Sequence, residues 1–365
     1  MLIFKVLIAL ILLVALFVVG VVVYAQIERR NYEKLSDTKD LKDRIANLTE
    51  PYLAKRPNVA LVIGLIQNGS EHVQGFGGKS PPDRFTIYEI GSITKVFTAI
   101  TLVKLVEDDR LKLDDPVSKC FPKDANIPTN ITFKHLATHS SGLPRLPSNF
   151  FAVVGNSPNP YILYKKEHLY EYFRTAKNLK TPGEPSGYSN LGFGLLGHAL
   201  ELCGGKSYGT LVPESVLTPL GMTNTSMTAT NVIPGHDPKG KPTSNWDFDV
   251  MAPAGALRSN VEDMLKFLRA NLSPEQTPIA AALRLCQKKH ARNCGLAWQM
   301  QTTFEGLHML WHNGGTGGYR TFCGLDPEHK TAVVLLSNYG DAFANDDSID
   351  KMGFEILKLA SKISL

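Results

Sequence analysis

The pattern of apolar and polar positions predicts strands at both ends of the chain and helices between them. The segment NVALVIGLIQNGSEHVQGFG holds two β-rich runs around Asn68-Gly69, a pair typical of a tight hairpin turn. Near the carboxyl end, LHMLWHNGG, YRTFCGLD and TAVVLLSNY form three more apolar runs. They follow one another too closely for helical crossovers, so we expect antiparallel pairing. A closing helix is expected at about Asp346–Lys362.

The middle of the chain, about residues 120–290, is rich in helical patterns and long loops. Before it, EIGSITKVFTAITLVKL predicts an apolar and therefore buried helix at about Ser92–Glu107. Strands at both ends and helices between them indicate an α+β fold with one antiparallel sheet, built from residues 55–90 and 295–365, and an inserted helical region at about 92–290. We expect these parts to form one domain, 51–365.

Two segments precede this domain. Residues 1–27 contain an unbroken apolar run, Val6–Ala25, which is long enough to cross a bilayer. It exceeds the apolar core of a cleaved signal peptide, so we expect a retained transmembrane anchor, although small residues before a cleavage point leave removal open. Residues 28–50 form a charged stalk and an amphipathic segment. Basic residues after the run outnumber Lys5 before it, which taken alone places the domain in the cytoplasm.

Composition excludes several classes of protein. The net charge is only +5 over 365 residues and the basic residues are scattered, so nothing indicates nucleic-acid binding. The five cysteines are too few and too irregular for a disulfide framework, and they include no C-x-x-C pair that would suggest zinc. The sequence leaves one bridge open, with Cys286 and Cys294 as the candidate pair.

The first candidate for chemistry is Ser92 with Lys95. Three residues are almost one helical turn, so both side chains point to the same side of the helix start. Gly91 permits a close backbone approach, and free N–H groups at a helix start can hold a developing oxyanion. A desolvated lysine loses its proton readily and can serve as a base. The alternative is an ordinary capping serine beside a solvated lysine.

Two further stretches add polar groups next to regular elements. In GYSNLGFGLLGHALE, Tyr188 and Asn190 lie two apart before a helix, so a phenol that relays a proton and an amide that orients a carbonyl can face one side. The alternative is a loop cap and a core tyrosine. In WHNGGTGGYR, His312 follows a strand, and Gly314 and Gly315 let a substrate lie against the backbone. Another strand follows instead of a helix, which excludes a phosphate loop.

Two other motifs are set aside. GKSYG, around Ser207, fits the nucleophile elbow of α/β-hydrolases, but that elbow needs a preceding strand, and here a helical run precedes it. Ser207 therefore reads as a helix cap, and an α/β-hydrolase built on it is the alternative fold. His135 and His139 have the i, i+4 spacing of some zinc sites, but they lack the glutamate and a third ligand.

Taken together, the motifs resemble those of the serine β-lactamase-like superfamily, which includes class C β-lactamases, D-alanyl-D-alanine carboxypeptidases, D-aminopeptidases and related esterases. The matching stretches come in the family's order and extend from about residue 55 to 340. They are YEIGSITKVFTAI, LKLDDPVSK, ITFKHLATHSSGLP, PGEPSGYSNLGFGLLGHALE, PLGMTNT, PAGALRSNVEDMLKFL and WHNGGTGGYRT. The resemblance implies a sheet flanked by helices, with the active site beside an all-helical region.

The resemblance also implies roles for the residues. Ser92 would be the acylated nucleophile, Lys95 would take or steer its proton, and Tyr188 would activate Ser92 and protonate the leaving group. The substrate-binding residues would be Asn190, which holds the amide, with His312 and Gly314 on the edge strand. The N–H groups of Ser92 and Gly315 would form the oxyanion hole.

We therefore expect an exported, membrane-attached serine hydrolase that acts through an acyl-enzyme on β-lactams or D-alanyl-type amides. A small-molecule or peptide substrate is implied, with no metal, organic cofactor, nucleic acid or obligate protein partner. Class C β-lactamases usually carry lysine where His312 stands, and a partly charged histidine attracts a substrate carboxylate less reliably. The alternatives are a carboxylesterase of the same fold and a penicillin-binding sensor that is acylated without turnover.

Overall fold

The structure is a computed structural model of the 365-residue chain. It describes residues 13–15, 17–20, 23, 26, 41–78, 80–176, 179–183, 187–340 and 348–363. The chain divides into two compact units, Met1–Pro51 and Tyr52–Leu365. Helix α2 (Leu41–Ala54) crosses the division, and the larger unit contains every other helix and strand described below.

Most of the apolar run Val6–Ala25 lies outside the described residues, as does most of the charged stalk. Among the residues that the structure does describe, no helix combines the length and apolar character needed to cross a membrane. The transmembrane segment expected from the sequence therefore has no support in the structure.

The larger unit is built on one six-stranded antiparallel sheet, in the order β2-β1-β8-β7-β6-β5. Strands from both ends of the chain are joined where β1 pairs with β8, as the sequence predicted. The strands are β1 (Ala60–Gln67), β2 (Ser70–Gly77), β5 (Gln299–Thr302), β6 (His308–Gly315), β7 (Arg320–Asp326) and β8 (Thr331–Ser337).

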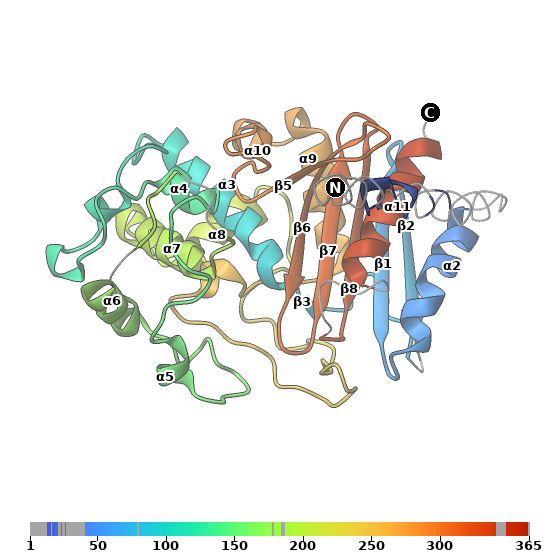
Figure 1. Ribbon diagram of the computed structural model, residues 1–365, viewed down its shortest axis with the longest axis horizontal. Coiled ribbons are helices and arrows are strands. Elements are labelled where there is room, and N and C mark those ends of the chain that lie inside the picture. Colours follow the sequence, from blue (N-terminus) through green and yellow to red (C-terminus); the bar gives the residue numbers. More distant parts are fainter. Residues whose placement is uncertain are drawn as a thin grey trace, which may run out of the picture. The chain divides into compact units, whose positions relative to one another are not determined.

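Helices cover both faces of this sheet. Successive side chains on a strand point to opposite faces, and on β7 the backbone of Gly324 approaches Leu357 of α11 (Ile349–Ile363). Val334 on β8 lies directly opposite Cys323, and Gly64 on β1 places its face against Val334 and α9 (Val261–Leu272). Figure 1 shows α11 crossing one face of the strands and α9 lying behind them.

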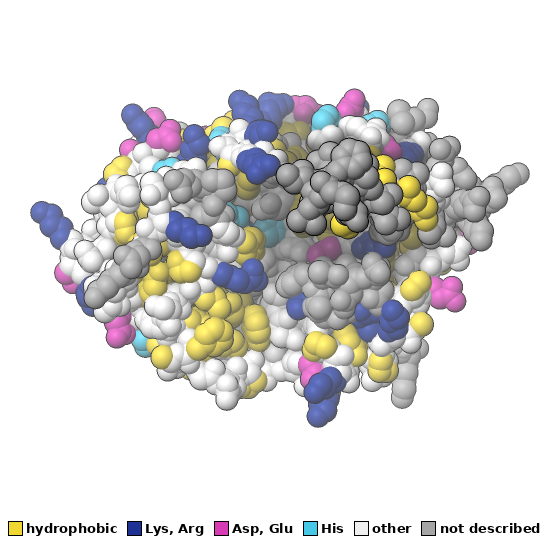
Figure 2. Space-filling model, viewed as in Figure 1, with side chains coloured by type: hydrophobic (Ala, Val, Ile, Leu, Met, Phe, Trp, Pro, Cys, Tyr) yellow, Lys and Arg dark blue, Asp and Glu magenta, His cyan; other side chains and the backbone are white. Residues whose placement is uncertain are grey.

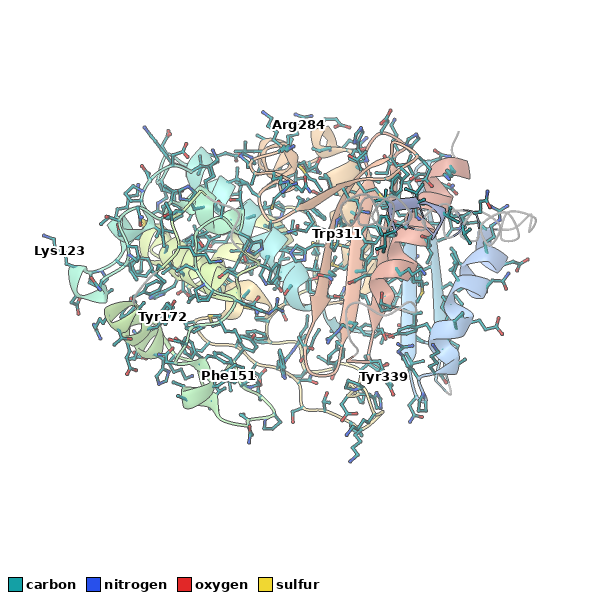
Figure 3. All side chains as sticks on the ribbon, in the orientation of Figure 1. Lys123, Phe151, Tyr172, Arg284, Trp311 and Tyr339 are labelled. Carbon is teal, nitrogen blue, oxygen red and sulfur yellow. A yellow bond between two sulfur atoms is a disulfide. The ribbon has the colours of Figure 1, made fainter. Side chains whose placement is uncertain are left out.

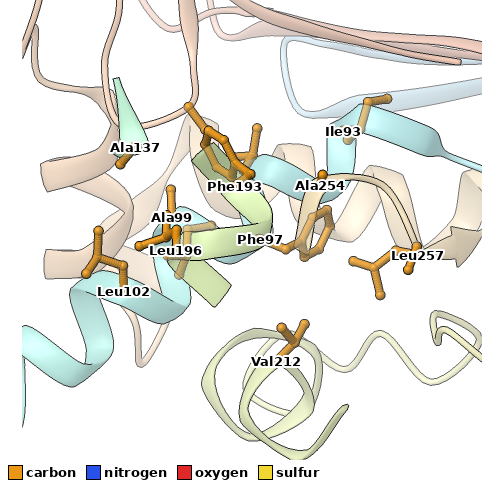
Figure 4. Close-up of a cluster of buried hydrophobic side chains, with 14 of the residues drawn as sticks. Ile93, Phe97, Ala99, Leu102, Ala137, Phe193, Leu196, Val212, Ala254 and Leu257 are labelled. Atoms are coloured by element: carbon orange, nitrogen blue, oxygen red, sulfur yellow. The ribbon is translucent and has the colours of Figure 1, made fainter. Parts of the chain in front are cut away.

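The inserted helices surround α3 (Thr94–Glu107), which is buried nearly all round. An α-helix that is apolar on every side belongs in the interior of a large unit. Figure 4 shows its side chains packed with Phe193 and Leu196 of α7, and Phe97 also stacks on Phe267 with ring centres 4.4 Å apart. The other helices are α4 (Phe133–Ala137), α5 (Phe150–Val154), α6 (Lys166–Thr175), α7 (Asn190–Gly204), α8 (Tyr208–Val212) and α10 (Ala280–Gln287).

Short elements depart from the sequence prediction. The helix expected from Ser92 begins as a single 3₁₀ turn, η1 (Gly91–Ile93), and the α-helix starts at Thr94. A second, two-stranded sheet pairs β3 (Tyr88–Glu89) with β4 (Arg258–Ser259), where one sheet was expected. Strands of two residues are too short to leave a periodic pattern in the sequence.

The cysteine pairing also differs from the expected one. Cys120 and Cys203 form a disulfide across 83 residues of sequence, whereas Cys286 and Cys294 are buried free thiols. The candidate pair chosen from the sequence was therefore wrong. The observed bridge attaches the loop after α3 to the last turn of α7.

Candidate active site

Ser92 lies in the 3₁₀ turn that introduces α3, and its side chain is half-buried. Lys95 follows three residues later in the first turn of α3, so the two side chains project from the same side. The ammonium nitrogen Nζ of Lys95 donates a hydrogen bond of 3.0 Å to Oγ of Ser92. The local geometry predicted for this pair is therefore present.

Lys95 is enclosed by apolar and neutral groups. Its side chain is 0% exposed, and Nζ also donates to the carbonyl of Ala254 at 2.6 Å. Nζ lies 4.7 Å from the ring centre of Tyr188, and in the described part of the chain it forms no ion pair with a carboxylate. Burial, assisted by the nearby charge of Arg145, lowers the pKa of the Lys95 amine well below its ordinary value.

Tyr188 stands beside the Ser92–Lys95 pair, with its phenol hydrogen-bonded to Ser92. Burial raises the pKa of the phenol above its ordinary value, more than the Ser92 hydrogen bond and the charge of Arg145 lower it. The ring of His139 stacks on that of Tyr188 at 4.4 Å, and Nδ1 of His139 accepts the N–H of Ser189 at 3.1 Å. The loop after α4 therefore fixes the turn that carries Tyr188.

Asn190 is the first residue of α7, two positions after Tyr188. The hydroxyl of Ser189 caps this helix by accepting the N–H of Gly192 at 2.8 Å. The side-chain amide of Asn190 donates to the hydroxyl of Tyr161 at 3.2 Å. Its carbonyl oxygen Oδ1 is buried and has no hydrogen-bond partner among the described residues, which leaves an acceptor available for a substrate N–H.

His312 lies within β6 rather than after a strand, and it is 1% exposed. Nδ1 donates to the carbonyl of Asn313 at 2.7 Å, so Nδ1 carries the proton and Nε2 is an acceptor without a partner in the described residues. Burial, with the nearby Lys95, lowers the pKa of His312 to about 3. The imidazole is therefore neutral at physiological pH, where the sequence suggested a partly charged side chain. Its ring centre is 6.2 Å from that of Tyr188.

The glycines of β6 let the strand lie directly against the Ser92 turn. A Cβ atom at Gly314 would lie 2.0 Å from the carbonyl oxygen of Ile90, and one at Gly91 would lie 2.5 Å from the backbone nitrogen of Gly315. Gly91 also has φ +51°, which favours glycine. Backbone contact this close requires glycine at all three positions, and it brings Gly315 next to the nucleophile turn.

A cavity of about 620 Å³ opens beside Tyr188 and His312. It continues toward the loop 290–294 and the start of β5, and its lining includes four histidines, Lys134 and Arg292, but no acidic residue of the described chain. Figure 2 shows histidine side chains in a hollow near the middle of the face in view. Trp311, which lines the same cavity, lies between the sheet and the helical elements of the larger unit (Figure 3).

Residues that the sequence did not single out also belong to this site. Arg145 places its guanidinium 5.2 Å from the ring centre of Tyr188, and Tyr161 holds Asn190. His139 supports Tyr188 through the contacts described above. The sequence held no signal for them beyond the position of Arg145 directly after SGLP, because each is brought to the site by tertiary folding.

The motifs set aside from the sequence lie elsewhere or serve structural ends. Ser207 is exposed at the start of α8, and its hydroxyl pairs with that of Thr210 at 3.0 Å. Nδ1 of His135 accepts the N–H of Thr132 at 3.3 Å as part of a helix cap. No cluster of three or more histidine, cysteine or acidic residues suited to a metal ion occurs in the part of the chain that the structure describes.

Comparisons with known proteins agree on one family. The family model described as "Beta-lactamase" matches residues 45–351. The chain is 29% identical over 333 residues to "D-alanyl-D-alanine-carboxypeptidase/endopeptidase AmpH" of Escherichia coli (strain K12), covering 81% of this chain and 83% of that protein. It is 24% identical over 346 residues to "Beta-lactamase" of Pseudomonas fluorescens, covering 82% of this chain and 94% of that one.

The fold has a solved counterpart. The crystal structure of a class C beta lactamase from Rhodobacter sphaeroides superposes with a TM-score of 0.73, at 20% sequence identity, and covers 86% of this chain and 98% of that one. An identity this low supports the likeness of fold alone. Together with the family match over residues 45–351, it establishes that the chain belongs to the beta-lactamase family and is a serine hydrolase of the β-lactamase and D,D-peptidase type.

Proposed function

We propose that the protein hydrolyses D-alanyl-type amides or β-lactams through an ester formed on Ser92. The observation that supports this most strongly is the hydrogen bond of 3.0 Å between Nζ of Lys95 and Oγ of Ser92, made by an amine that is completely buried. An alcohol near its unperturbed pKa needs an adjacent base, and a buried amine with a lowered pKa is such a base.

In the proposed acylation step, Lys95 accepts the proton of Ser92 while Oγ bonds to the substrate carbonyl carbon. The carbon–nitrogen bond then breaks, and the leaving nitrogen takes the proton of the Tyr188 phenol, which is replaced from Lys95. The opposite pKa shifts support this assignment, because the amine is poised to accept a proton and the phenol to keep one. Water then attacks the ester, which releases a carboxylic acid and restores Ser92.

The remaining site residues are proposed to bind the substrate. The N–H groups of Ser92 and Gly315 would stabilise the oxyanion, in keeping with the contact between the Gly91 turn and β6. Asn190 would accept the substrate amide N–H at its open Oδ1. His312 and Gly314 would line the strand edge along which the substrate lies.

Substrate class is tested by turnover of three compounds: a chromogenic cephalosporin, an N-acyl-D-Ala-D-Ala peptide and a p-nitrophenyl ester. The relative named D-alanyl-D-alanine-carboxypeptidase/endopeptidase supports peptide or β-lactam turnover. Ser92→Ala should abolish whichever activity is found. Ester turnover alone would make the protein a carboxylesterase, and a stable adduct without turnover would make it a penicillin-binding sensor.

We further propose that the catalytic domain is exported and attached to a membrane by the segment Val6–Ala25. Support comes from the Cys120–Cys203 disulfide, because such bridges persist in oxidising compartments outside the cytosol. Fractionation followed by protease treatment of intact cells tests both parts. Export predicts that the domain is digested from outside, and attachment predicts that the chain stays with membranes after alkaline carbonate extraction.

A further inference from the structure

Arg145 lies at the active site with its side chain exposed and without a polar partner. It belongs to the loop that follows α4, and its guanidinium carbon lies 5.2 Å from the centre of the Tyr188 ring. Among the described residues its side chain forms no ion pair and no hydrogen bond. A guanidinium stacked on an aromatic face keeps its edge N–H groups free to donate to another molecule.

The backbone fixes this arginine to the catalytic turn. Its carbonyl oxygen accepts the N–H of Asn190 at 3.0 Å and that of Leu191 at 3.2 Å. These are the first two residues of α7, directly after the turn that carries Tyr188. Arg145 and Tyr188 are therefore held together by the backbone, so the position of the charge does not depend on the side-chain stacking alone.

The other basic groups next to the nucleophile carry little charge at neutral pH. Lys95 is buried and has a lowered pKa, and His312 is buried and neutral. The described residues that line the cavity include no carboxylate. Arginine remains protonated at any physiological pH. Arg145 is thus a permanent cation beside the reacting groups, at a site where anions of the protein are lacking.

We propose that Arg145 binds a carboxylate of the substrate and selects anionic substrates over neutral ones. The inference rests on the proposed function at Ser92 and extends it by assigning the counter-charge to the loop after α4. It explains how the site recognises an anion although residue 312 is an uncharged histidine. The planar fork of the guanidinium matches both oxygens of a carboxylate, and such charge-assisted pairs are among the stronger hydrogen bonds.

The test compares two thioesters that differ in one group, N-phenylacetyl-D-alanyl thioglycolate and the corresponding thioglycolamide. Release of thiol reports both reactions. For Arg145→Gln we expect kcat/KM for the carboxylate compound to fall by about 10- to 100-fold, mainly through KM, and that for the carboxamide to change less than about threefold. Arg145→Lys should recover part of the loss, because it keeps the charge but not the fork.

Control variants separate this role from its rivals. Arg284→Gln removes an exposed arginine of α10 whose partner is Glu275, far from the reacting groups in the fold (Figure 3), and should leave both rates unchanged. An equal loss on both thioesters in Arg145→Gln overturns the proposal, because Arg145 would then act on Lys95 or Tyr188. A charge-selective loss in Arg292→Gln but not in Arg145→Gln also overturns it.

Failure of the underlying function is recognised separately. Ser92→Ala must abolish thiol release from both compounds if Ser92 is the nucleophile. If it retains both activities, the proposed function fails whatever Arg145 does. If it loses both while Arg145→Gln keeps the parent preference for the carboxylate, only the assignment of Arg145 fails.

Discussion

At the residue scale, the protonation states of Lys95 and Tyr188 determine how the site works. Both groups are buried beside Ser92, but burial disfavours the charged form of each, so it lowers the pKa of the amine and raises that of the phenol. At neutral pH the site therefore favours a free amine and an intact phenol. This combination provides a base for the nucleophile and an acid for the leaving group without any metal-bound water.

The lowered pKa of Lys95 predicts the pH dependence of activity. We expect kcat/KM to rise with pH as the amine loses its proton and to level off well below the ordinary lysine value of 10.5. Lys95→Met should lower kcat/KM by about 10³-fold and remove this rise. A parent profile that keeps rising until about pH 10.5 would contradict Lys95 as the base.

The same shift has a consequence for stability. Between its lowered pKa and 10.5, Lys95 is neutral in the folded chain and protonated in the unfolded chain. The unfolded state then binds the additional proton, so the free energy of unfolding rises with pH through that window. Urea titrations of the parent and of Lys95→Met measure this slope, which should be smaller in the variant.

Tyr188 is predicted to matter in proportion to how much the leaving group needs a proton. Tyr188→Phe should lower kcat/KM for an N-acyl-D-Ala-D-Ala peptide by about 10²- to 10⁴-fold. The loss on a p-nitrophenyl ester should be much smaller, because nitrophenolate leaves without protonation. Tyr170→Phe is the matched control, since the Tyr170 hydroxyl bonds His198 at 2.8 Å away from this site. Equal losses of Tyr188→Phe on both substrates would contradict the proton-donor role.

At the element scale, the approach of β6 to the turn η1 builds the site. Gly91→Ala should abolish most activity, because its methyl group would press on the backbone of Gly315 and because φ is +51°. Gly69→Ala separates these two causes. Gly69 has φ +79° in the β1–β2 turn, but no atom lies within 4 Å of its Cβ position. It should cost about 1 kcal/mol of stability and leave kcat/KM unchanged.

Denaturant titrations and kinetics on both variants give the result. If Gly91→Ala kept the activity of the parent, the close contact between η1 and β6 would not form in the working enzyme. If Gly69→Ala lost activity as Gly91→Ala does, general destabilisation rather than a local clash would explain the effect.

What the sequence could predict depended on whether the signal was local. The hairpin at Asn68-Gly69 and the three closing strands were confirmed, because turn chemistry and apolar runs determine them within a few residues. The α+β arrangement followed from the order of those elements. The 3₁₀ turn at Gly91 was missed, since helix starts vary by a residue or two even when the helix itself is clear.

For the site, the sequence identified the residues that occur in ordered motifs, and the structure places Ser92, Lys95, Tyr188 and His312 around one cavity mouth. Their chemical roles stay proposals. The position of Arg145 over Tyr188 had no sequence signal, because stacking between a loop and a turn 43 residues further along is a tertiary contact. The neutral state of His312 depends on burial, which the sequence alone does not determine.

At the scale of the whole molecule, the disulfide between Cys120 and Cys203 constrains the longest loop. Cross-linking across 83 residues reduces the entropy of the unfolded chain, so the double variant Cys120→Ser, Cys203→Ser should lose about 4 kcal/mol of stability. Dithiothreitol should lower the melting temperature of the parent but not that of the double variant. Five alkylated thiols on the unreduced, denatured parent would contradict the bridge.

The central claim is that Ser92 becomes acylated, and intact-mass analysis tests it most directly. The parent chain and Ser92→Ala are mixed with benzylpenicillin, or with a p-nitrophenyl ester, and quenched in acid during turnover. We predict a gain of one acyl group per parent chain, located by peptide mapping on the peptide that contains Ser92, and none in Ser92→Ala. An adduct that persists in Ser92→Ala, or one that maps to Ser207 or any other residue, would contradict the account.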